Sequence, residues 1–163
     1  MDVILRPFAW GDFNAFFECC SNSLIRKYLG QFSEPTRNVV YCEFCYYMKK
    51  STSSSPTAWV IDLSGKMIGH IFVSQSILFR KTLEIEYCLL PRYWGNGYMH
   101  SALKKLLEQL TQTKSVEKVV ALVSPTNERS AKVLSGMKFR YETSVSANGE
   151  CYNIFCYTLP PAI

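Results

Sequence analysis

Two glycines in the stretch "RYWGNGY" could form a ligand-binding loop. Gly95 and Gly97 lie one residue apart, after a predicted strand and before the clearest predicted helix. A helix N-terminus exposes unpaired backbone N–H groups and the positive end of the helix dipole, and glycine lets a phosphate approach those groups closely. Arg92 would add a guanidinium suited to phosphate. The same glycines would also suit a plain turn, so the loop alone leaves both interpretations open.

Two familiar nucleotide-binding loops do not fit this stretch. A dinucleotide fingerprint requires a third glycine where His100 stands, and an acidic residue at the end of the next strand, which "KVVALVSP" lacks. The lysine-bearing G-x-x-x-x-G-K-[ST] loop is also missing from the sequence. We therefore exclude both.

Two glutamates precede the loop in the predicted strand "TLEIEYCLL". Glu84 and Glu86 are two residues apart, so they share one face of that strand. They could line a solvent-exposed face, or face a cleft where one of them accepts a proton from a substrate. A carboxylate partly removed from water beside a second carboxylate should have a raised pKa, which suits a base near neutral pH.

The elements that must position these residues follow from hydrophobic periodicity and turn signals. The predicted order is strand, two or three helices, three strands, helix, strand, helix and two strands. The turn "SG" at residues 64–65 and the turn in "ANGE" each indicate a hairpin. We predict helices at residues 10–22, 23–30, 33–50, 97–110 and 126–136, and strands at 2–8, 58–63, 66–75, 82–90, 118–125, 140–146 and 152–159. This order predicts an α+β (mixed α/β) domain with a largely antiparallel sheet and one strand-helix-strand crossover.

Composition narrows the class of protein. The chain has 163 residues, 48% hydrophobic and 19% charged, which suits one globular domain. The net charge of +5 is scattered, so it favours a small polyanionic ligand over nucleic acid. No apolar run is long enough to span a bilayer and the N-terminus lacks a signal-peptide pattern, so we expect a cytoplasmic protein that does not bind membranes.

The seven cysteines suggest neither disulfides nor a metal site, because their number is odd and their spacing forms no framework. The one C-x-x-C pair has no second pair with metal-like spacing, and His70 and His100 are isolated. We expect no bound metal. Four cysteines in helical segments are expected to be buried core thiols, namely Cys19, Cys20, Cys42 and Cys45.

Several motifs together resemble the GNAT superfamily of N-acetyltransferases. Arg92, Gly95 and Gly97 match R/Q-x-x-G-x-G/A, the acyl-CoA pyrophosphate loop of that superfamily. The segments "LEIEYCLLPRYWGNGYMHSAL", "VSPTNERSAKVLSGMKF" and "LRPF" with Asp12 resemble blocks of the subfamily that includes the ribosomal-protein N-terminal acetyltransferases. The resemblance covers nearly the whole chain. It implies one GNAT domain over residues 1–163, with a mostly antiparallel, twisted sheet of about seven strands flanked by helices and a splayed parallel pair of strands 4 and 5.

The resemblance also implies an activity and its residues. Acetyl-CoA would donate its acetyl group directly to a primary amine in a ternary complex, with no metal. Glu84 would be the general base and Glu86 would bind the amine, while backbone N–H groups of Cys88 to Leu90 would stabilise the oxyanion. The implied cofactor-binding residues are Cys88, Leu89, Leu90, Arg92, Trp94, Gly95, Asn96, Gly97, Tyr98, Met99, Asn127 and Ser130.

Some positions depart from the family pattern. The family often has glycine at the position of Glu86, and Gly136 and Lys138 are exchanged relative to the family pattern. Leu134 stands where many members have a tyrosine that serves as general acid. Asn127 and Ser130 could also be only an N-cap and a small packing residue.

The partners that the resemblance implies are amine acceptors, and the protein would be a monomer or a homodimer. The acceptor would be a peptide N-terminus, a ribosomal protein, or a small amine such as a polyamine or an aminoglycoside. The alternative function is a non-catalytic acyl-CoA sensor or interaction module on the same fold.

Overall fold

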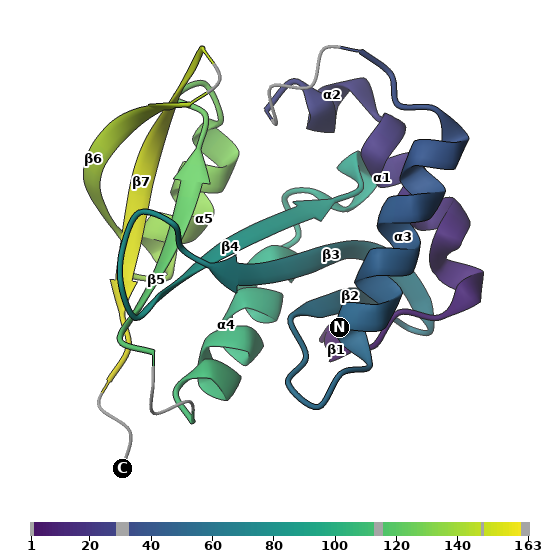
Figure 1. Ribbon diagram of the computed structural model, residues 1–163, viewed down its shortest axis with the longest axis horizontal. Coiled ribbons are helices and arrows are strands. Elements are labelled where there is room, and N and C mark those ends of the chain that lie inside the picture. Colours follow the sequence, from purple (N-terminus) through teal and green to yellow (C-terminus); the bar gives the residue numbers. More distant parts are fainter. Residues whose placement is uncertain (1, 29–32, 113–115, 148, 161–163) are drawn as a thin grey trace. The chain divides into compact units, whose positions relative to one another are not determined.

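A computed structural model describes residues 2–28, 33–112, 116–147 and 149–160 (Figure 1). Its elements follow in the order β1 (Ile4–Arg6), η1 (Trp10–Asp12), α1 (Phe13–Ser21), α2 (Ser23–Arg26), α3 (Arg37–Ser51), β2 (Ala58–Leu63), β3 (Lys66–Gln75), β4 (Thr82–Leu89), η2 (Pro91–Tyr93), α4 (Tyr98–Leu110), β5 (Lys118–Val123), α5 (Glu128–Gly136), β6 (Arg140–Ala147) and β7 (Glu150–Thr158). This order confirms the predicted succession. The predicted end of the second helix at Gly30 lies outside the described residues.

The strands form one seven-stranded sheet in the order β1-β2-β3-β4-β5-β7-β6. The pairings β1/β2, β2/β3, β5/β7 and β6/β7 are antiparallel, and β4/β5 is parallel. Helix α4 connects the two parallel strands, as a crossover connection requires. The predicted α+β class, with its single parallel pair, is confirmed. In the described part of the chain, no helix is long and apolar enough to cross a membrane.

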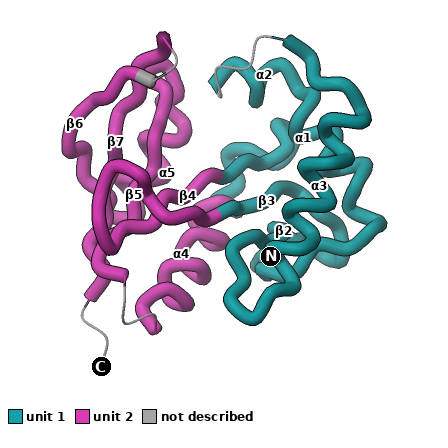
Figure 2. The backbone as a smooth tube through the Cα atoms, in the orientation of Figure 1, with its two compact units in different colours: residues 1–72, 87–98 teal, residues 73–86, 99–163 magenta. Residues whose placement is uncertain are grey.

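Contacts divide the chain into two compact units (Figure 2). Unit 1 comprises residues 1–72 and 87–98, and unit 2 comprises residues 73–86 and 99–163. Strands β3 and β4 therefore contribute residues to both units.

Unit 1 has an aromatic core between its helices and strands. Phe8 is 4% exposed and packs edge-on against Phe16, Phe44 and Tyr47, with ring centroids 5.8, 5.9 and 5.7 Å away. At the edge of this core, the Arg6 guanidinium donates hydrogen bonds of 2.7 and 2.8 Å to a carboxylate in η1 and one of 2.7 Å to a carboxylate in β2. These carboxylates, Asp12 and Asp62, are buried, so the Arg6 charge is needed to offset the cost of burying theirs.

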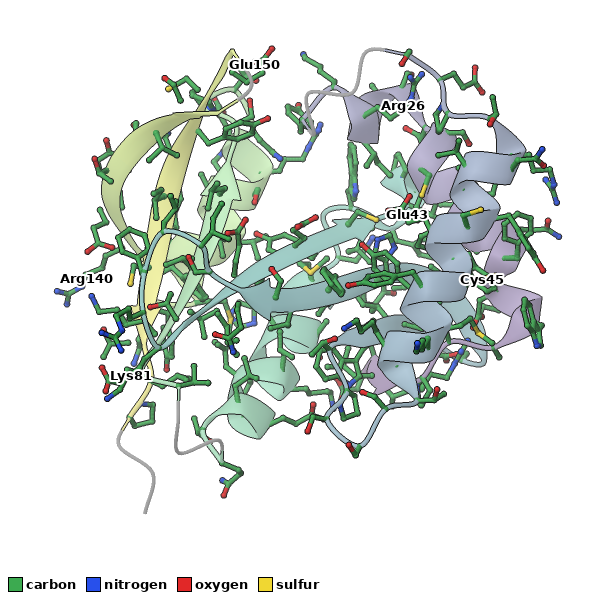
Figure 3. All side chains as sticks on the ribbon, in the orientation of Figure 1. Arg26, Glu43, Cys45, Lys81, Arg140 and Glu150 are labelled. Atoms are coloured by element: carbon green, nitrogen blue, oxygen red, sulfur yellow. The ribbon has the colours of Figure 1, made fainter. Side chains whose placement is uncertain are left out.

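The prediction that the four helical cysteines are buried is correct for Cys19 and wrong for Cys42, and Cys20 is only partly buried. Helix α3 buries Val40, Phe44 and Tyr47, which recur at helical spacing. Cys42 lies on the opposite side of that helix and is exposed. Cys45, which Figure 3 labels on α3, is half-buried. The apolar face of α3 is therefore narrower than its run of aromatic residues suggested.

Unit 2 contains the strongest amphipathic helix. Helix α4 buries the apolar stripe that its sequence predicted, listed as Met99, Ala102, Leu103, Leu106, Leu107 and Leu110. The parallel pairing joins Thr82–Glu84 to Lys118–Val120 and stops there among the described residues, although both strands continue. This early end of the ladder is in keeping with the predicted splay between strands 4 and 5.

The exchange of Gly136 and Lys138 changes how α5 ends. The Phe139 N–H donates to the Leu134 carbonyl and the Lys138 N–H to the Ser135 carbonyl, each at 3.0 Å, which is a Schellman motif. This motif requires a left-handed residue, and Lys138 takes that place with φ of 67°. A non-glycine residue in this conformation is strained by about 1–2 kcal/mol. Gly136 occupies the last helical position, where a Cβ would meet nothing within 4 Å.

Restoring glycine at the left-handed position should stabilise the protein. We expect Lys138→Gly to raise the free energy of unfolding by about 0.5–1 kcal/mol, because relief of strain exceeds the added chain entropy. Denaturant unfolding measures this change. Lys138→Ala is the matched control, since it removes the same side chain but keeps the strain. Equal stability of the two variants would contradict the explanation.

Candidate active site

Strands β3 and β4 approach each other very closely at Gly69 in unit 1. A Cβ on Gly69 would lie 2.2 Å from the carbonyl oxygen of Cys88 and 3.0 Å from the Cα of Leu89, so no other residue fits here. The Leu90 N–H donates to the Ile68 carbonyl at 2.9 Å. The two strands also contact each other through their side chains, since the Cys88 sulfur lies 3.4 Å from the His70 ring.

The hydrogen bond between β3 and β4 determines which N–H groups of the segment from Cys88 to Leu90 point away from β3. The Leu90 N–H is already bonded to β3. Because peptide groups alternate along a strand, the N–H of Leu89 points to the opposite edge of β4. The Leu89 carbonyl accepts a hydrogen bond of 2.8 Å from the Trp94 indole. Of the Leu89 and Leu90 N–H groups, the one that points away from β3 is therefore that of Leu89.

The glycine loop has the conformation that its sequence suggested. Gly95 and Gly97 have φ of 79° and 76°, which side chains rarely adopt, and a Cβ on either would meet nothing within 4 Å. Both glycines and Asn96 are exposed, and the Asn96 amide donates to the carbonyls of Tyr93 and Trp94 at 3.3 and 3.0 Å. Helix α4 begins directly after the loop, at Tyr98. The open space above the glycines is what a phosphate would need, and the turn itself requires glycine in any case.

Arg92 forms an ion pair that the sequence did not reveal. Its guanidinium binds the carboxylate of Glu18 in α1 through both terminal nitrogens, and the contact from Nη2 to Oε2 is 3.1 Å. The hydrogen bonds that Arg92 donates to Glu18 raise the pKa of Arg92. About half of each side chain is exposed, 53% for Arg92 and 44% for Glu18. Such exposed pairs contribute at most about 1 kcal/mol, so an incoming anion can compete for Arg92.

In unit 2, Glu84 has the environment expected of a base. The side chain is partly buried, and burial raises the pKa of Glu84, with a further increase from the negative charge of Glu86. Glu86 itself is exposed. The raised pKa brings Glu84 closer to the range in which a carboxylate exchanges protons at neutral pH.

Asn127 caps helix α5, also in unit 2. Its side-chain oxygen accepts a hydrogen bond of 3.2 Å from the backbone N–H of Ser130. The interpretation of Asn127 as an N-cap is thus correct. The cap uses only the side-chain oxygen of Asn127 and not its amide nitrogen. Ser130 lies in the first turn of α5 and is half-buried.

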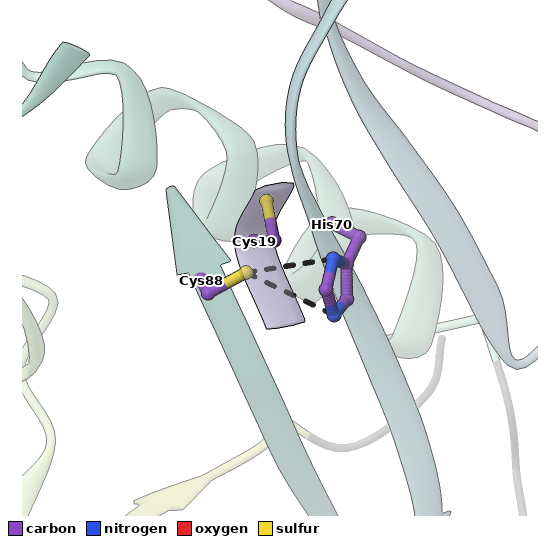
Figure 4. A group of neighbouring side chains, drawn as sticks. All are labelled: Cys19, His70 and Cys88. Carbon is purple, nitrogen blue, oxygen red and sulfur yellow. Dashed lines mark hydrogen bonds between the residues drawn. The ribbon is translucent and has the colours of Figure 1, made fainter. Parts of the chain in front are cut away.

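The structure also assembles three residues far apart in the sequence. The Sγ of Cys88 lies 3.4 Å from Nδ1 and 3.8 Å from Nε2 of His70, and Figure 4 shows these two side chains pointing toward one another. Contact with the Cys19 thiol lowers the pKa of Cys88 and raises the pKa of Cys19, since the buried Cys19 thiol stays protonated and donates to the Cys88 sulfur. No motif in the sequence indicates this cluster, because α1, β3 and β4 each contribute one residue.

The predicted site residues are divided between the units. Unit 1 holds the end of β4, Arg92, Trp94 and the glycine loop up to Tyr98. Unit 2 holds Glu84, Glu86, Met99, Asn127 and Ser130. Met99 is buried in the apolar stripe of α4, so its side chain serves packing.

Known proteins resemble this chain in sequence and in fold. The family model "Acetyltransferase (GNAT) domain" matches residues 2–140. The chain is 25% identical to the uncharacterized N-acetyltransferase YnaD of Bacillus subtilis over 144 residues, which covers 86% of this chain and 80% of YnaD.

Two solved structures show the same fold. The aminoglycoside acetyltransferase AAC(6')-Ib in complex with ribostamycin and coenzyme A has a TM-score of 0.81 and 19% identity, over 97% of this chain and 94% of that chain. RimL, a ribosomal L7/L12 alpha-N-protein acetyltransferase in complex with coenzyme A, has a TM-score of 0.78 and 16% identity, over 98% of this chain and 95% of that chain. The sequence match over most of the chain, together with this fold, decides the family. The chain belongs to the GNAT family of acetyltransferases.

Proposed function

We propose that the protein transfers an acetyl group from acetyl-CoA to a primary amine, as one GNAT domain over residues 1–163. The observation that carries the proposal is the open loop of Gly95 and Gly97 at the start of α4, in a chain of this family. In this proposal, the loop N–H groups from Gly95 to Tyr98 bind the pyrophosphate of CoA, and Arg92 binds it once released from Glu18. We further propose Met99, Asn127 and Ser130, all in unit 2, as cofactor-binding residues.

The reaction would proceed by direct attack of the amine on the thioester. Glu84 accepts the proton of the amine, directly or through water, and Glu86 attracts the cationic acceptor before that proton is lost. The nitrogen forms a bond to the acetyl carbon, the Leu89 N–H donates to the developing oxyanion, and the bond to sulfur breaks. The CoA thiolate leaves with the electron pair of that bond and takes a proton from solvent. No metal takes part in this step.

The acceptor class follows from charge and from the related structures. AAC(6')-Ib is described in complexes with aminoglycosides, and RimL acts on a protein α-amino group. Two neighbouring glutamates favour a cationic amine, which both kinds of acceptor provide. We therefore propose a small polyamine-like compound, an aminoglycoside or a peptide N-terminus, such as that of a ribosomal protein. A cytoplasmic location would supply each of these together with acetyl-CoA, and a monomer or a homodimer would suffice.

The glycine loop is tested with two isosteric variants. We expect Gly97→Asp to weaken acetyl-CoA binding at least about tenfold more than Gly97→Asn, because only Asp adds a charge that repels the pyrophosphate. Asn and Asp both tolerate the left-handed conformation, so the backbone effect cancels. Isothermal titration calorimetry with acetyl-CoA gives both dissociation constants. Equal affinities would show that the loop is only a turn.

The catalytic proposal is tested by CoA thiol release with a panel of amines. The wild-type protein should release thiol only when an acceptor amine is present, and Glu84→Gln should lower kcat by about 10²- to 10⁴-fold. Acetyl-CoA affinity is the control, and it should stay unchanged. Full turnover by Glu84→Gln would refute Glu84 as the base. Tight acetyl-CoA binding without turnover on any amine would favour the alternative, a non-catalytic acyl-CoA sensor.

The pH profile tests how the two glutamates interact. The negative charge of Glu86 disfavours ionisation of Glu84, so Glu86→Gln should lower the pKa of Glu84. A base must be deprotonated, and the acidic limb of kcat/KM should therefore move to lower pH in this variant. Glu86→Asp, which keeps the charge, should leave the limb close to that of the wild type. An unchanged limb in Glu86→Gln would mean that another group titrates.

The Arg92–Glu18 pair yields a prediction on affinity. If Glu18 competes with the pyrophosphate for Arg92, Glu18→Ala should tighten acetyl-CoA binding by up to about fivefold, the equivalent of about 1 kcal/mol. Arg92→Ala should weaken binding, and Glu18→Ala should have no effect in that background. Calorimetry of the two single variants and the double variant completes the cycle. A gain in affinity that persists without Arg92 would contradict the competition.

A further inference from the structure

We propose that Cys19, His70 and Cys88 form a binding site for a thiophilic metal ion, with Zn²⁺ as the best fit. The sulfur atoms of the two cysteines and a ring nitrogen of the histidine all lie within 4.8 Å of one another. Two thiolates and one imidazole are ligands that zinc prefers, and they leave a fourth position open for water or a further ligand. The proposal does not depend on acetyl transfer.

The distance between Cys88 and His70 is close to that between two ligand atoms of a tetrahedral zinc site. Zn–S bonds of about 2.3 Å and Zn–N bonds of about 2.0 Å place neighbouring ligand atoms about 3.5–3.8 Å apart. The Cys88 Sγ already lies 3.4 Å from Nδ1 of His70. The sulfur lies at a similar distance, 3.8 Å, from Nε2, so neither ring nitrogen points its lone pair directly at it. The imidazole ring must therefore rotate to direct one lone pair at the metal. Small movements of the side chains would complete the site.

The surroundings favour a soft divalent ion over a hard one. Cys19 is 1% exposed, and the imidazole of His70 lies among the rings of Phe8, Phe16 and Tyr47, with centroids 6.2, 5.0 and 5.4 Å away. In such apolar surroundings an uncompensated charge is costly. Zn²⁺ with two thiolates and a neutral imidazole forms a complex without net charge, after each thiol has lost one proton to solvent. Mg²⁺ and Ca²⁺ prefer oxygen ligands, which this cluster lacks.

The three ligands come from elements whose positions within unit 1 are already determined. Cys88 and His70 lie in contact on the neighbouring strands β4 and β3, next to the close approach at Gly69. Cys19 reaches them from α1, whose apolar side packs in the same core (Figure 4). The ligands are thus held near each other before the metal arrives, which reduces the entropy that binding must overcome.

Cobalt(II) titration of the full-length protein tests the site directly, with a phosphine reductant keeping the thiols reduced. We expect one equivalent of Co²⁺ to produce thiolate-to-cobalt charge-transfer absorption and the visible bands of tetrahedral cobalt, and one equivalent of Zn²⁺ to abolish both. Cys19→Ser and Cys88→Ser should each weaken metal binding by at least about a hundredfold, since even outer-shell substitutions cost about 10- to 100-fold.

The C-x-x-C pair provides the control. Cys42→Ser and Cys45→Ser should keep both absorption features, and far-UV circular dichroism establishes that every variant is folded. The proposal is overturned if the wild-type protein shows no charge-transfer absorption, a result that does not depend on how the variants fold. It is also overturned if the absorption survives in Cys88→Ser or disappears in Cys45→Ser.

Discussion

The close approach of β3 and β4 at Gly69 is the constraint on which the candidate site depends. A side chain at this position would overlap the Cys88 carbonyl, so glycine is required for the two strands to pair. In this pairing the Leu90 N–H donates a hydrogen bond to β3, so the Leu89 N–H and carbonyl point to the other edge of β4. Cys88 and His70 also lie in contact next to it. One glycine outside every recognised motif thus determines which backbone groups of this segment are bonded to β3 and which point away from it.

Two charged candidate residues, Arg92 in unit 1 and Glu84 in unit 2, have different surroundings. Arg92 is exposed and bound by Glu18, so its charge is solvated and easily redirected to another anion. Glu84 is half-buried near a like charge, so its ionised form is disfavoured. The first arrangement suits the capture of a phosphate, and the second suits the transfer of a proton. Glu84 and Arg92 lie in one short segment of the sequence, so their different surroundings arise from how far the fold buries each side chain.

The core of unit 1 joins the structural and chemical roles of its residues. Aromatic rings from α1 and α3 surround His70, and Cys19 is buried beside them. The Cys19 thiol is thereby removed from water, and the His70 imidazole and the Cys88 thiol are partly removed from it. The same packing that stabilises the helices on β3 thus concentrates three metal-binding groups.

Local sequence was sufficient for the elements of this protein, because periodicity and turn residues are local properties. The strands β2 and β3, the apolar stripe of α4 and the Asn127 cap follow from patterns within a few residues. The glycine loop was also recognisable, because a motif and its conformation lie in one segment. The exposure of Cys42, the Glu18 partner of Arg92 and the cluster around His70 were decided only by tertiary structure. Each depends on residues from separate elements, and no spacing in the sequence encodes how a helix and two strands meet.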